Sequence, residues 1–400
     1  MAIMAKILVK NLVKIFGDHP DRALKLLREG RSKEEILAKT RQTVGINNVN
    51  LAVEEGEIFV LMGLSGSGKS TLLRCLNRLI EPTSGTIELD GRDITTVDEA
   101  ELREIRRKRL GMVFQRFALF PHRTVLDNVA FGLEVQGVDK KVRAEKARAT
   151  LEMVGLKGWE EYYPGSLSGG MQQRVGLARA LVSDPDVLLM DEPFSALDPL
   201  IRRDMQDELL SLQSQVNKTI VFVTHDLDEA LKLGDRIALM KDGEIVQLGT
   251  PEEILTRPAN EYVRRFVEDV DVTRILTAEG VMKPAEAVAL KDGPRVALRR
   301  MRERGLSSVF VVTRDRKLAG IVTADDALAA AERNDEDLSR ILIQDFPRTA
   351  LDAPVAEIIP VLANSRYPVA VVREDGKLLG VVVRGSLLAG LVRKDEVAWN

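Results

Sequence analysis

The sequence predicts an α/β domain built on a parallel sheet, followed by a smaller module that contains two copies of one α+β unit. Up to about residue 270, short β-branched runs alternate with longer amphipathic stretches. The runs at 57–62, 187–190 and 219–223 are largely apolar, which is typical of strands buried on both faces of a parallel sheet. Beyond this point an internal repeat appears. We therefore expect one domain at 1–270 and another at 271–395.

The internal repeat has an offset of sixty residues and places 308–322 over 368–382. Each copy reads as a strand, a charged turn, a second strand and a helix, and the copies span about 275–335 and 336–395. A unit with one exposed apolar face is expected to bury it against its twin. The positions that recur sixty residues later are Val309, Val311, Val312, Asp315, Lys317, Leu318, Gly320 and Val322.

Composition limits the classes of partner and compartment. Lys and Arg total 58 against 61 Asp and Glu, so the formal net charge is −3 and no overall field attracts nucleic acid. The single cysteine, Cys75, cannot form an intramolecular disulfide, which fits a reducing cytoplasm, and we expect it in the core. Lysines interrupt every apolar run near the N-terminus, and stretches such as 58–68 fall short of the roughly 20 residues of a membrane-spanning helix. Any role at a membrane therefore requires a partner.

An insertion at 18–43 interrupts the first part of the α/β domain. Its apolar residues Ala23, Leu24 and Leu27 have helical spacing, and the run from Ser32 to Glu35 has the sequence of a capping box. We expect two short helices there.

A phosphate-binding loop follows the expected strand at 57–62. Residues 63–71 fit the pattern G-x-x-x-x-G-K-[S/T] and lead into a helical stretch, a context that disfavours a glycine-rich turn with a chance lysine. Backbone N–H groups of such a loop surround phosphate oxygens, Lys69 reaches the β- and γ-phosphates, and Ser70 binds Mg²⁺. The expected nucleotide-binding residues here are Gly63, Leu64, Ser65, Gly66, Ser67, Gly68, Lys69, Ser70 and Thr71.

Two adjacent carboxylates end the expected strand at 187–190. Asp191 and Glu192 would repel each other without a cation nearby, which suggests that Asp191 binds Mg²⁺. Glu192 is then the candidate general base, or the group that orients the attacking water. An apolar run that ends in acids is common by itself, but after a phosphate-binding loop it indicates a nucleoside triphosphatase.

The octapeptide 167–174, Leu-Ser-Gly-Gly-Met-Gln-Gln-Arg, resembles the signature sequence of ATP-binding cassette (ABC) proteins. The resemblance covers residues 6–250. Gln115 is similar to the Q-loop glutamine, 195–198 to the D-loop, and His225 to the switch histidine. In isolation His225 could be an ordinary structural histidine, but its place after an expected strand favours the switch role.

The resemblance implies a machine made of two cassettes packed head to tail. In this arrangement Ser168, Gly169 and Gly170 of one protomer contact the γ-phosphate that Lys69 of the other protomer holds, and Asp198 connects the two sites. His225 and Gln115 would act with Glu192 in hydrolysis, and Gln115 would join Ser70 and Asp191 as a ligand of Mg²⁺. Phe16 is the aromatic residue placed to stack on adenine.

A narrower resemblance points to the ATPase subunits of glycine betaine and proline importers. It rests on the insertion after Phe16, on 115–121, on 225–230 and on the C-terminal repeat. It implies a homodimer of cassettes at the cytoplasmic face of the inner or plasma membrane, a permease subunit and an extracytoplasmic substrate-binding protein. The run at 116–122 contains two phenylalanines and a leucine, and we expect it to dock on the permease; anchoring of a helical subdomain is the alternative, and the run could do both.

The repeat resembles a tandem CBS pair, a module that often senses adenosyl compounds or ionic conditions. In the first copy, 320–326 matches the motif G-[I/V]-[I/V]-[S/T]-x-x-D, so Thr323 would contact phosphate and Asp326 ribose. The second copy has Val383 and Ser386 at these places, which disfavours an ordinary second nucleotide site. A purely structural packing role is the alternative.

Five arginines gather on the expected first helix of the repeat module. Such a cluster could bind an anionic membrane and release it as salt screens the charges, although a solvated helix face is the simpler interpretation. They are Arg295, Arg299, Arg300, Arg302 and Arg304.

Three other functions compete with osmoprotectant import. A soluble ABC ATPase outside transport usually has two cassettes or a long coiled coil, and this chain has neither. A sensing module with a degenerate cassette would lack one of the residues expected to bind or hydrolyse ATP. This chain has all four of them: Lys69, Asp191, Glu192 and His225. Importers of amino acids, metals or polyamines share the cassette, and the CBS-like repeat argues against each.

Overall fold

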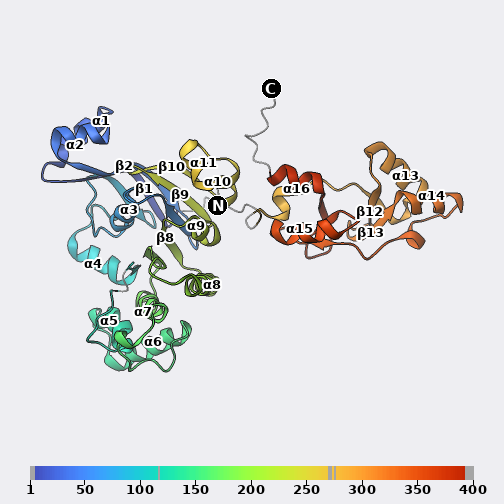
Figure 1. Ribbon diagram of the computed structural model, residues 1–400. Helices are drawn as coiled ribbons and strands as arrows, with labels where there is room; N and C mark the ends of the chain where they lie inside the picture. Colours follow the sequence, from blue (N-terminus) through green and yellow to red (C-terminus); the bar gives the residue numbers. More distant parts are fainter. Residues whose placement is uncertain (1–4, 116–117, 269–272, 274–275, 392–400) are drawn as a thin grey trace. The chain divides into compact units, whose positions relative to one another are not determined.

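The computed structural model describes residues 5–115, 118–268, 273 and 276–391, and it divides into two compact units, Met1–Glu268 and Asp269–Asn400 (Figure 1). The first unit is an α/β domain, and the second is an α+β module. None of the helices in the described part of the chain combines the length and the apolar character that a membrane crossing requires.

The centre of the first unit is a six-stranded sheet with the order β10-β9-β3-β8-β7-β6. Its strands pair in parallel except β10, which is antiparallel to β9. The three strands expected from the sequence are confirmed as β3, β7 and β8, and every residue in them is buried. The strands are β3 (Ile58–Met62), β6 (Leu110–Val113), β7 (Val187–Asp191), β8 (Thr219–Thr224), β9 (Arg236–Lys241) and β10 (Glu244–Gly249).

A second, antiparallel sheet with the order β2-β1-β4-β5 was not distinguished by the sequence analysis. It contains β1 (Ile7–Phe16), β2 (Thr43–Val53), β4 (Ser84–Leu89) and β5 (Arg92–Asp93). The insertion connects β1 to β2 and forms α1 (Pro20–Arg28) and α2 (Lys33–Thr40), with Ser32 capping α2. Ala23 and Ile36 are fully buried in a small core that these helices share with β1 and β2. The insertion is therefore ordered and packs against β1 and β2.

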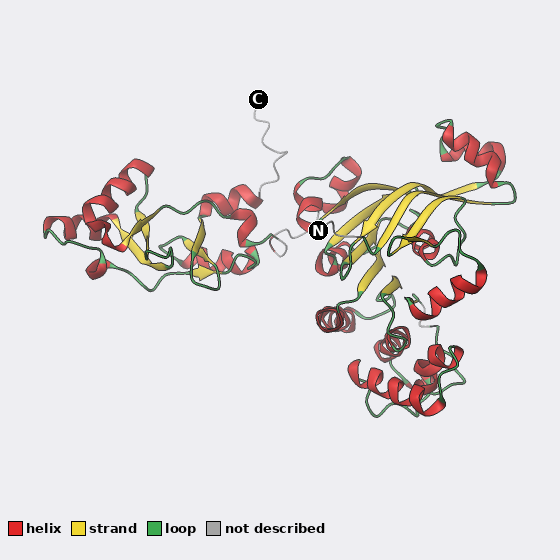
Figure 2. Ribbon diagram, turned by 180° about the vertical axis from the view of Figure 1, so that it is seen from behind, coloured by secondary structure: helices red, strands yellow, loops and turns green. Residues whose placement is uncertain are grey.

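Helices lie at the ends of the sheets and in a group apart from them (Figure 2). Helix α3 begins directly after the phosphate-binding loop, and α5, α6 and α7 pack on one another as a separate group. The helices of this unit are α3 (Lys69–Leu76), α4 (Glu99–Lys108), α5 (Val125–Val135), α6 (Lys140–Met153), α7 (Gly169–Leu181), α8 (Pro199–Val216), α9 (Leu227–Leu233), α10 (Pro251–Thr256) and α11 (Glu261–Val267), with a short 3₁₀ turn at Pro164–Ser166.

Cys75 lies in the main core, as the sequence predicts, and is fully buried. Burial raises the pKa of its thiol to about 12. Because the thiolate is the reactive form, we expect the folded chain to resist a thiol reagent in mildly alkaline buffer, whereas one thiol per chain reacts after unfolding in urea. Labelling with and without urea, followed by mass spectrometry, measures this. Equal rates in both conditions would contradict the burial of Cys75.

The second unit contains two three-stranded sheets, β11-β12-β13 and β14-β15-β16. In each sheet the first pair is parallel and the second antiparallel, which confirms the repeat. The arginine-rich helix is α13, the second helix of the module and not the first, because α12 precedes it. The elements are α12 (Ala278–Val281), β11 (Ala287–Ala289), a 3₁₀ turn at Leu290–Asp292, α13 (Gly293–Arg304), β12 (Ser308–Val312), β13 (Leu318–Thr323), α14 (Ala324–Glu332), a 3₁₀ turn at Ser339–Ile341, β14 (Arg348–Thr349), α15 (Val355–Asn364), β15 (Val369–Val372), β16 (Leu378–Val382) and α16 (Arg384–Leu391).

The two copies exchange the segments with which they begin. Helix α12, at the start of the first copy, packs in the core of the second copy, while Leu338, at the start of the second copy, packs in the core of the first. The repeated glycines lie at these crossings. A Cβ at Gly320 would lie 2.5 Å from the Leu342 side chain, and one at Gly380 would lie 2.6 Å from Met282 Sδ. Glycine recurs at these positions because the exchanged segment leaves no room for a side chain.

Candidate active site

The loop after β3 is shaped by glycines that no other residue can replace without strain. Gly63 and Gly68 have φ values of 149° and 103°. A Cβ would lie 2.2 Å from the Met240 carbonyl oxygen at Gly63 and 2.7 Å from the Gly45 carbonyl oxygen at Gly68. The loop is therefore held closely against the neighbouring backbone, with helix α3 beginning at its end.

Lys69 lies across this loop. Its Nζ donates to the carbonyl oxygens of Gly63, at 2.8 Å, and Leu64, at 3.1 Å. The side chain is almost fully buried, and this burial lowers the pKa of Lys69, while the carboxylates of Glu192 and Asp191 oppose the shift. The ammonium group is thus held within the loop by two of its carbonyl oxygens.

Ser70 and Asp191 meet although 121 positions separate them. The Ser70 hydroxyl donates to Asp191 Oδ1 at 2.7 Å, and Arg74 Nη2 donates to Asp191 Oδ2 at 3.1 Å. A hydroxyl and a carboxylate are hard oxygen ligands that suit Mg²⁺, which usually takes few protein ligands beside substrate phosphates. Sequence reasoning missed Arg74, although its position four residues after Ser70 on one helix face could have indicated the contact.

Glu192 sits at the carboxyl end of β7 with a strained backbone. Its φ is 47°, a left-handed value that non-glycine residues rarely adopt. Its N–H donates to the Val223 carbonyl oxygen at 3.1 Å, and its own carbonyl oxygen accepts from Ser195 Oγ at 3.0 Å. These bonds hold the residue between β8 and the segment that follows β7.

The side chain of Glu192 brings three expected catalytic residues together. Its Oε2 lies 3.2 Å from His225 Nδ1 and accepts from Gln115 Nε2 at 3.1 Å. These residues follow three neighbouring strands, β7, β8 and β6, whose carboxyl ends lie at the same edge of the sheet. Lys69 and Ser70 follow β3 at this edge as well. The arrangement can bind a triphosphate and direct a water at it.

The signature residues occupy the start of α7, in the separate helical group. Ser168 caps the helix by accepting from Met171 N at 3.3 Å, and Ser168 and Gly169 are exposed. A Cβ at Gly170 would lie 2.6 Å from Ile201 Cγ2, so glycine allows α7 to approach α8. The exposed helix start is available to a second molecule.

Phe16 and Asp198 also keep exposed positions. Phe16 ends β1 with 39% of its surface exposed, and Lys14 Nζ lies 5.1 Å from its ring centroid. Asp198 precedes α8 and makes no capping hydrogen bond with its side chain. Within the part of the chain that the structure describes, neither side chain forms a hydrogen bond or ion pair with Glu192.

The expected docking run at 116–122 lies beside a hollow, although residues 116 and 117 fall outside the described residues. The ring of Phe120 packs against Phe131 at 4.7 Å between centroids, and Arg179 Nη1 donates to the Ala118 carbonyl oxygen at 2.7 Å. A surface hollow of about 370 Å³ lies between α4, α5 and α7, and Phe131 and Arg179 line it. Ala118 and Phe120 therefore contact the helical group through two residues that line the recess.

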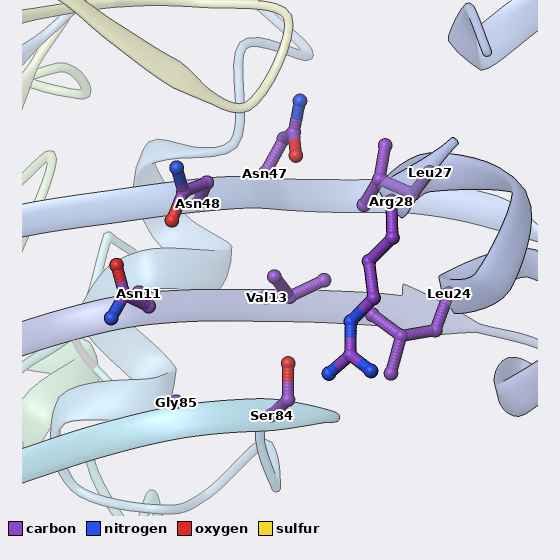
Figure 3. Close-up of a pocket in the computed structure, with 9 residues that line it drawn as sticks. All are labelled: Asn11, Val13, Leu24, Leu27, Arg28, Asn47, Asn48, Ser84 and Gly85. Atoms are coloured by element: carbon purple, nitrogen blue, oxygen red, sulfur yellow. The ribbon is translucent and has the colours of Figure 1, made fainter. Parts of the chain in front are cut away.

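The described chain has a further hollow beside the insertion, and none of the expected site residues lines it. Figure 3 shows its side chains, which come from α1 and from the neighbouring strands β1, β2 and β4. The volume is about 520 Å³. The lining residues are Asn11, Val13, Leu24, Leu27, Arg28, Asn47, Asn48, Ser84 and Gly85.

The second unit has a hollow of about 820 Å³ between the two copies. Basic residues from both copies line it, namely Lys283, Arg366 and Arg384. In the first copy, Thr323 Oγ1 donates to Asp326 Oδ2 at 2.6 Å at the start of α14. The motif residues of the first copy are thus satisfied by each other, and Val383, one of the two positions where the second copy departs from the motif, lines the hollow.

The arginines of α13 are partly neutralised. Arg304 Nε lies 3.0 Å and Arg300 Nη1 3.7 Å from the carboxylate of Glu286, which also lines the 820 Å³ hollow. Arg295 donates to Asn334, and Arg299 lies 4.0 Å from Glu303. The helix therefore presents less free charge than the sequence suggests.

Two family models match this chain. The ABC transporter model covers residues 46–195, and the CBS domain model covers 278–333 and 338–393.

Curated relatives match nearly the whole chain. The glycine betaine transport ATP-binding protein OpuAA of Bacillus subtilis is 57% identical over 98% of this chain and 93% of its own length. The glycine betaine/carnitine transport ATP-binding protein GbuA of Listeria monocytogenes is 57% identical over 97% and 98%. The glycine betaine/proline betaine transport system ATP-binding protein ProV of Escherichia coli is 50% identical over 97% and 98%.

Solved structures match the first unit. The dimeric structure of MJ0796, a bacterial ABC transporter cassette, has a TM-score of 0.52 and 35% identity, and the match covers 61% of this chain and 98% of that one. A post-hydrolysis dimer of the same cassette, bound to ADP and Pi, has a TM-score of 0.52, 34% identity and the same coverage.

Proposed function

The chain belongs to the family of ABC transporter ATP-binding proteins that includes the glycine betaine transport ATP-binding proteins, and on this premise we propose that it drives the uptake of glycine betaine and related betaines. The family matches confirm the cassette, the tandem CBS pair and the ATPase class that the sequence predicts. Relatives that match 97% or more of this chain are named as transport proteins, which disfavours an ATPase outside transport.

The observation that carries the catalytic proposal is the contact of Glu192 with both His225 and Gln115. Lys69 and the loop amides would hold the β- and γ-phosphates of ATP, and Phe16 would stack on adenine. Glu192 would accept a proton from the water that attacks the γ-phosphate, while His225 keeps the carboxylate in place. The products are ADP and phosphate. Ser70, Asp191 and Gln115 would hold Mg²⁺, and this ion would neutralise part of the negative charge of the phosphates.

Two copies would pack head to tail, so that the exposed start of α7 in one copy completes the site of the other. Free N–H groups at Ser168, Gly169 and Gly170 suit an anion such as the γ-phosphate. Asp198 would lie between the two sites. The recess between α4, α5 and α7 offers a place for a segment of the permease, and this attachment would hold the chain at the cytoplasmic face of the membrane. An extracytoplasmic binding protein would deliver the solute to the permease.

The CBS pair would regulate transport. The basic residues of the 820 Å³ hollow suit a ligand with phosphate groups, and Glu286 connects this hollow to Arg300 and Arg304 of α13. A nucleotide in the hollow or an anionic membrane on α13 would therefore act on the same group of charges.

The transport proposal is tested with the chain, its permease and its binding protein together in vesicles. We expect glycine betaine to stimulate ATP hydrolysis, and an amino acid such as lysine or a polyamine such as spermidine to have no effect. The Glu192→Gln variant in the same vesicles is the matched control for ATP-driven uptake. Stimulation by lysine or spermidine alone would overturn betaine import, and a solute-independent ATPase would overturn a role in transport.

A further inference from the structure

The turn that carries His225 is held by a compact polar cluster. Thr224 Oγ1 donates to Glu229 Oε2 at 2.6 Å and accepts from Asp226 N at 3.0 Å. Asp226 caps helix α9: its Oδ1 accepts hydrogen bonds from the N–H groups of Asp228 and Glu229. Glu229 is 5% exposed, so this cluster is an internal support for the histidine.

Arg202 of helix α8 reaches this cluster from the other side. Its Nη1 lies 3.2 Å from Asp226 Oδ2, and its Nε lies 3.8 Å from Glu229 Oε1. Its Nη2 donates to the Leu197 carbonyl oxygen at 3.3 Å, in the segment that leads from Glu192 to α8. One guanidinium therefore contacts both the His225 turn and the segment after β7.

These contacts form a closed circuit around the catalytic carboxylate. The carbonyl oxygen of Glu192 is bonded by Ser195, two residues before Leu197. From there the circuit passes through Arg202 and Asp226 to the adjacent His225, whose Nδ1 lies 3.2 Å from Glu192 Oε2. The positive φ of Glu192 is a strained conformation that persists only where surrounding contacts hold it, and this circuit adds to the hydrogen bond from its N–H to the Val223 carbonyl oxygen.

We propose that Arg202 is a positioning residue for ATP hydrolysis, which closes this circuit and sets His225 against Glu192. The inference rests on the proposed role of these two residues. Arginine suits the task because its planar fork reaches a carbonyl oxygen and two carboxylates at once, which a lysine ammonium cannot do in one geometry. Gln206 Nε2 also donates to Glu229 at 3.2 Å, so Glu229 keeps a partner when Arg202 is replaced.

The experiment uses full-length Arg202→Gln and measures turnover, ATP affinity and melting temperature. We expect kcat to fall about 10- to 100-fold, the effect of a misplaced catalytic group, with nucleotide affinity and melting temperature unchanged. The neighbouring, exposed Arg203→Gln is the matched control and keeps wild-type turnover. Arg202→Lys restores part of kcat, because it keeps the charge beside Asp226.

A double-mutant cycle separates positioning from stability. If Arg202 acts through Asp226, the Arg202→Gln/Asp226→Asn pair loses less turnover than the sum of the single losses. Wild-type kcat in Arg202→Gln, or a loss accompanied by an equal loss of ATP affinity or melting temperature, would overturn the proposal. A wild-type chain without ATPase activity in vesicles that hold its permease, its binding protein and glycine betaine would instead overturn the proposed function.

Discussion

Replacing Glu192 with glutamine is expected to abolish steady-state ATP turnover and to leave nucleotide binding intact. Glutamine has the same shape, so the contacts with His225 and Gln115 can persist. An amide, however, cannot accept the proton of the attacking water, and the loss of a general base typically costs about 10²- to 10⁴-fold in rate. Phosphate release measures turnover, and a fluorescent ATP analogue measures binding.

The exposed surface carboxylate Glu99, on α4, supplies the matched control. Glu99→Gln changes the charge by the same amount and is expected to turn over ATP at the wild-type rate. Undiminished turnover in Glu192→Gln would remove this residue from the catalytic step. Loss of turnover together with loss of nucleotide binding would show a binding role instead.

Lys69→Ala and Ser168→Arg are each expected to be inactive alone and to recover activity when mixed. Lys69 holds phosphate inside its own chain, whereas the exposed Ser168 at the start of α7 would serve the partner's nucleotide. A mixed dimer therefore contains one intact site, built from the loop of the Ser168→Arg chain and the α7 of the Lys69→Ala chain. ATP hydrolysis by the separate and mixed proteins measures the recovery.

The control mixes Lys69→Ala with Glu192→Gln. Both changes affect the loop side of a site, so each site of the mixed dimer carries one defect and no recovery is expected. Recovery in this control, or none in the Lys69→Ala and Ser168→Arg mixture, would contradict the head-to-tail arrangement.

The local parts of the site could be predicted because a short segment determines them. The loop at 63–71 is contiguous, and its glycine spacing alone specifies its shape. The meeting of Glu192 and His225 was implied by the resemblance to ABC cassettes, and it agrees with the rule that functional groups gather at the carboxyl ends of parallel strands. The strands β3, β7 and β8 could be predicted because each is a continuous apolar run, which is typical of a strand buried on both faces of a sheet.

The other parts depend on contacts that return from distant segments. The antiparallel sheet was missed because the insertion separates β1 from β2, so the sequence has no short hairpin turn that would predict their pairing. Arg202 and Asp226 form an ion pair although 24 positions separate them. The sequence has 58 basic and 61 acidic residues, and nothing in it distinguishes these two from the others. The left-handed backbone of Glu192 likewise has no sequence signal, because glutamate carries no preference for it.

The exchange of segments between the two CBS copies determines how this part of the chain can unfold. Helix α12 completes the core of the second copy and Leu338 that of the first, so neither copy has a closed apolar core of its own. Unfolding of one copy removes apolar side chains from the core of the other. The two copies are therefore expected to unfold together in one cooperative step. A chain cut between the copies would yield two fragments that each lack part of their interior. The two copies of the repeat therefore form a single folding unit.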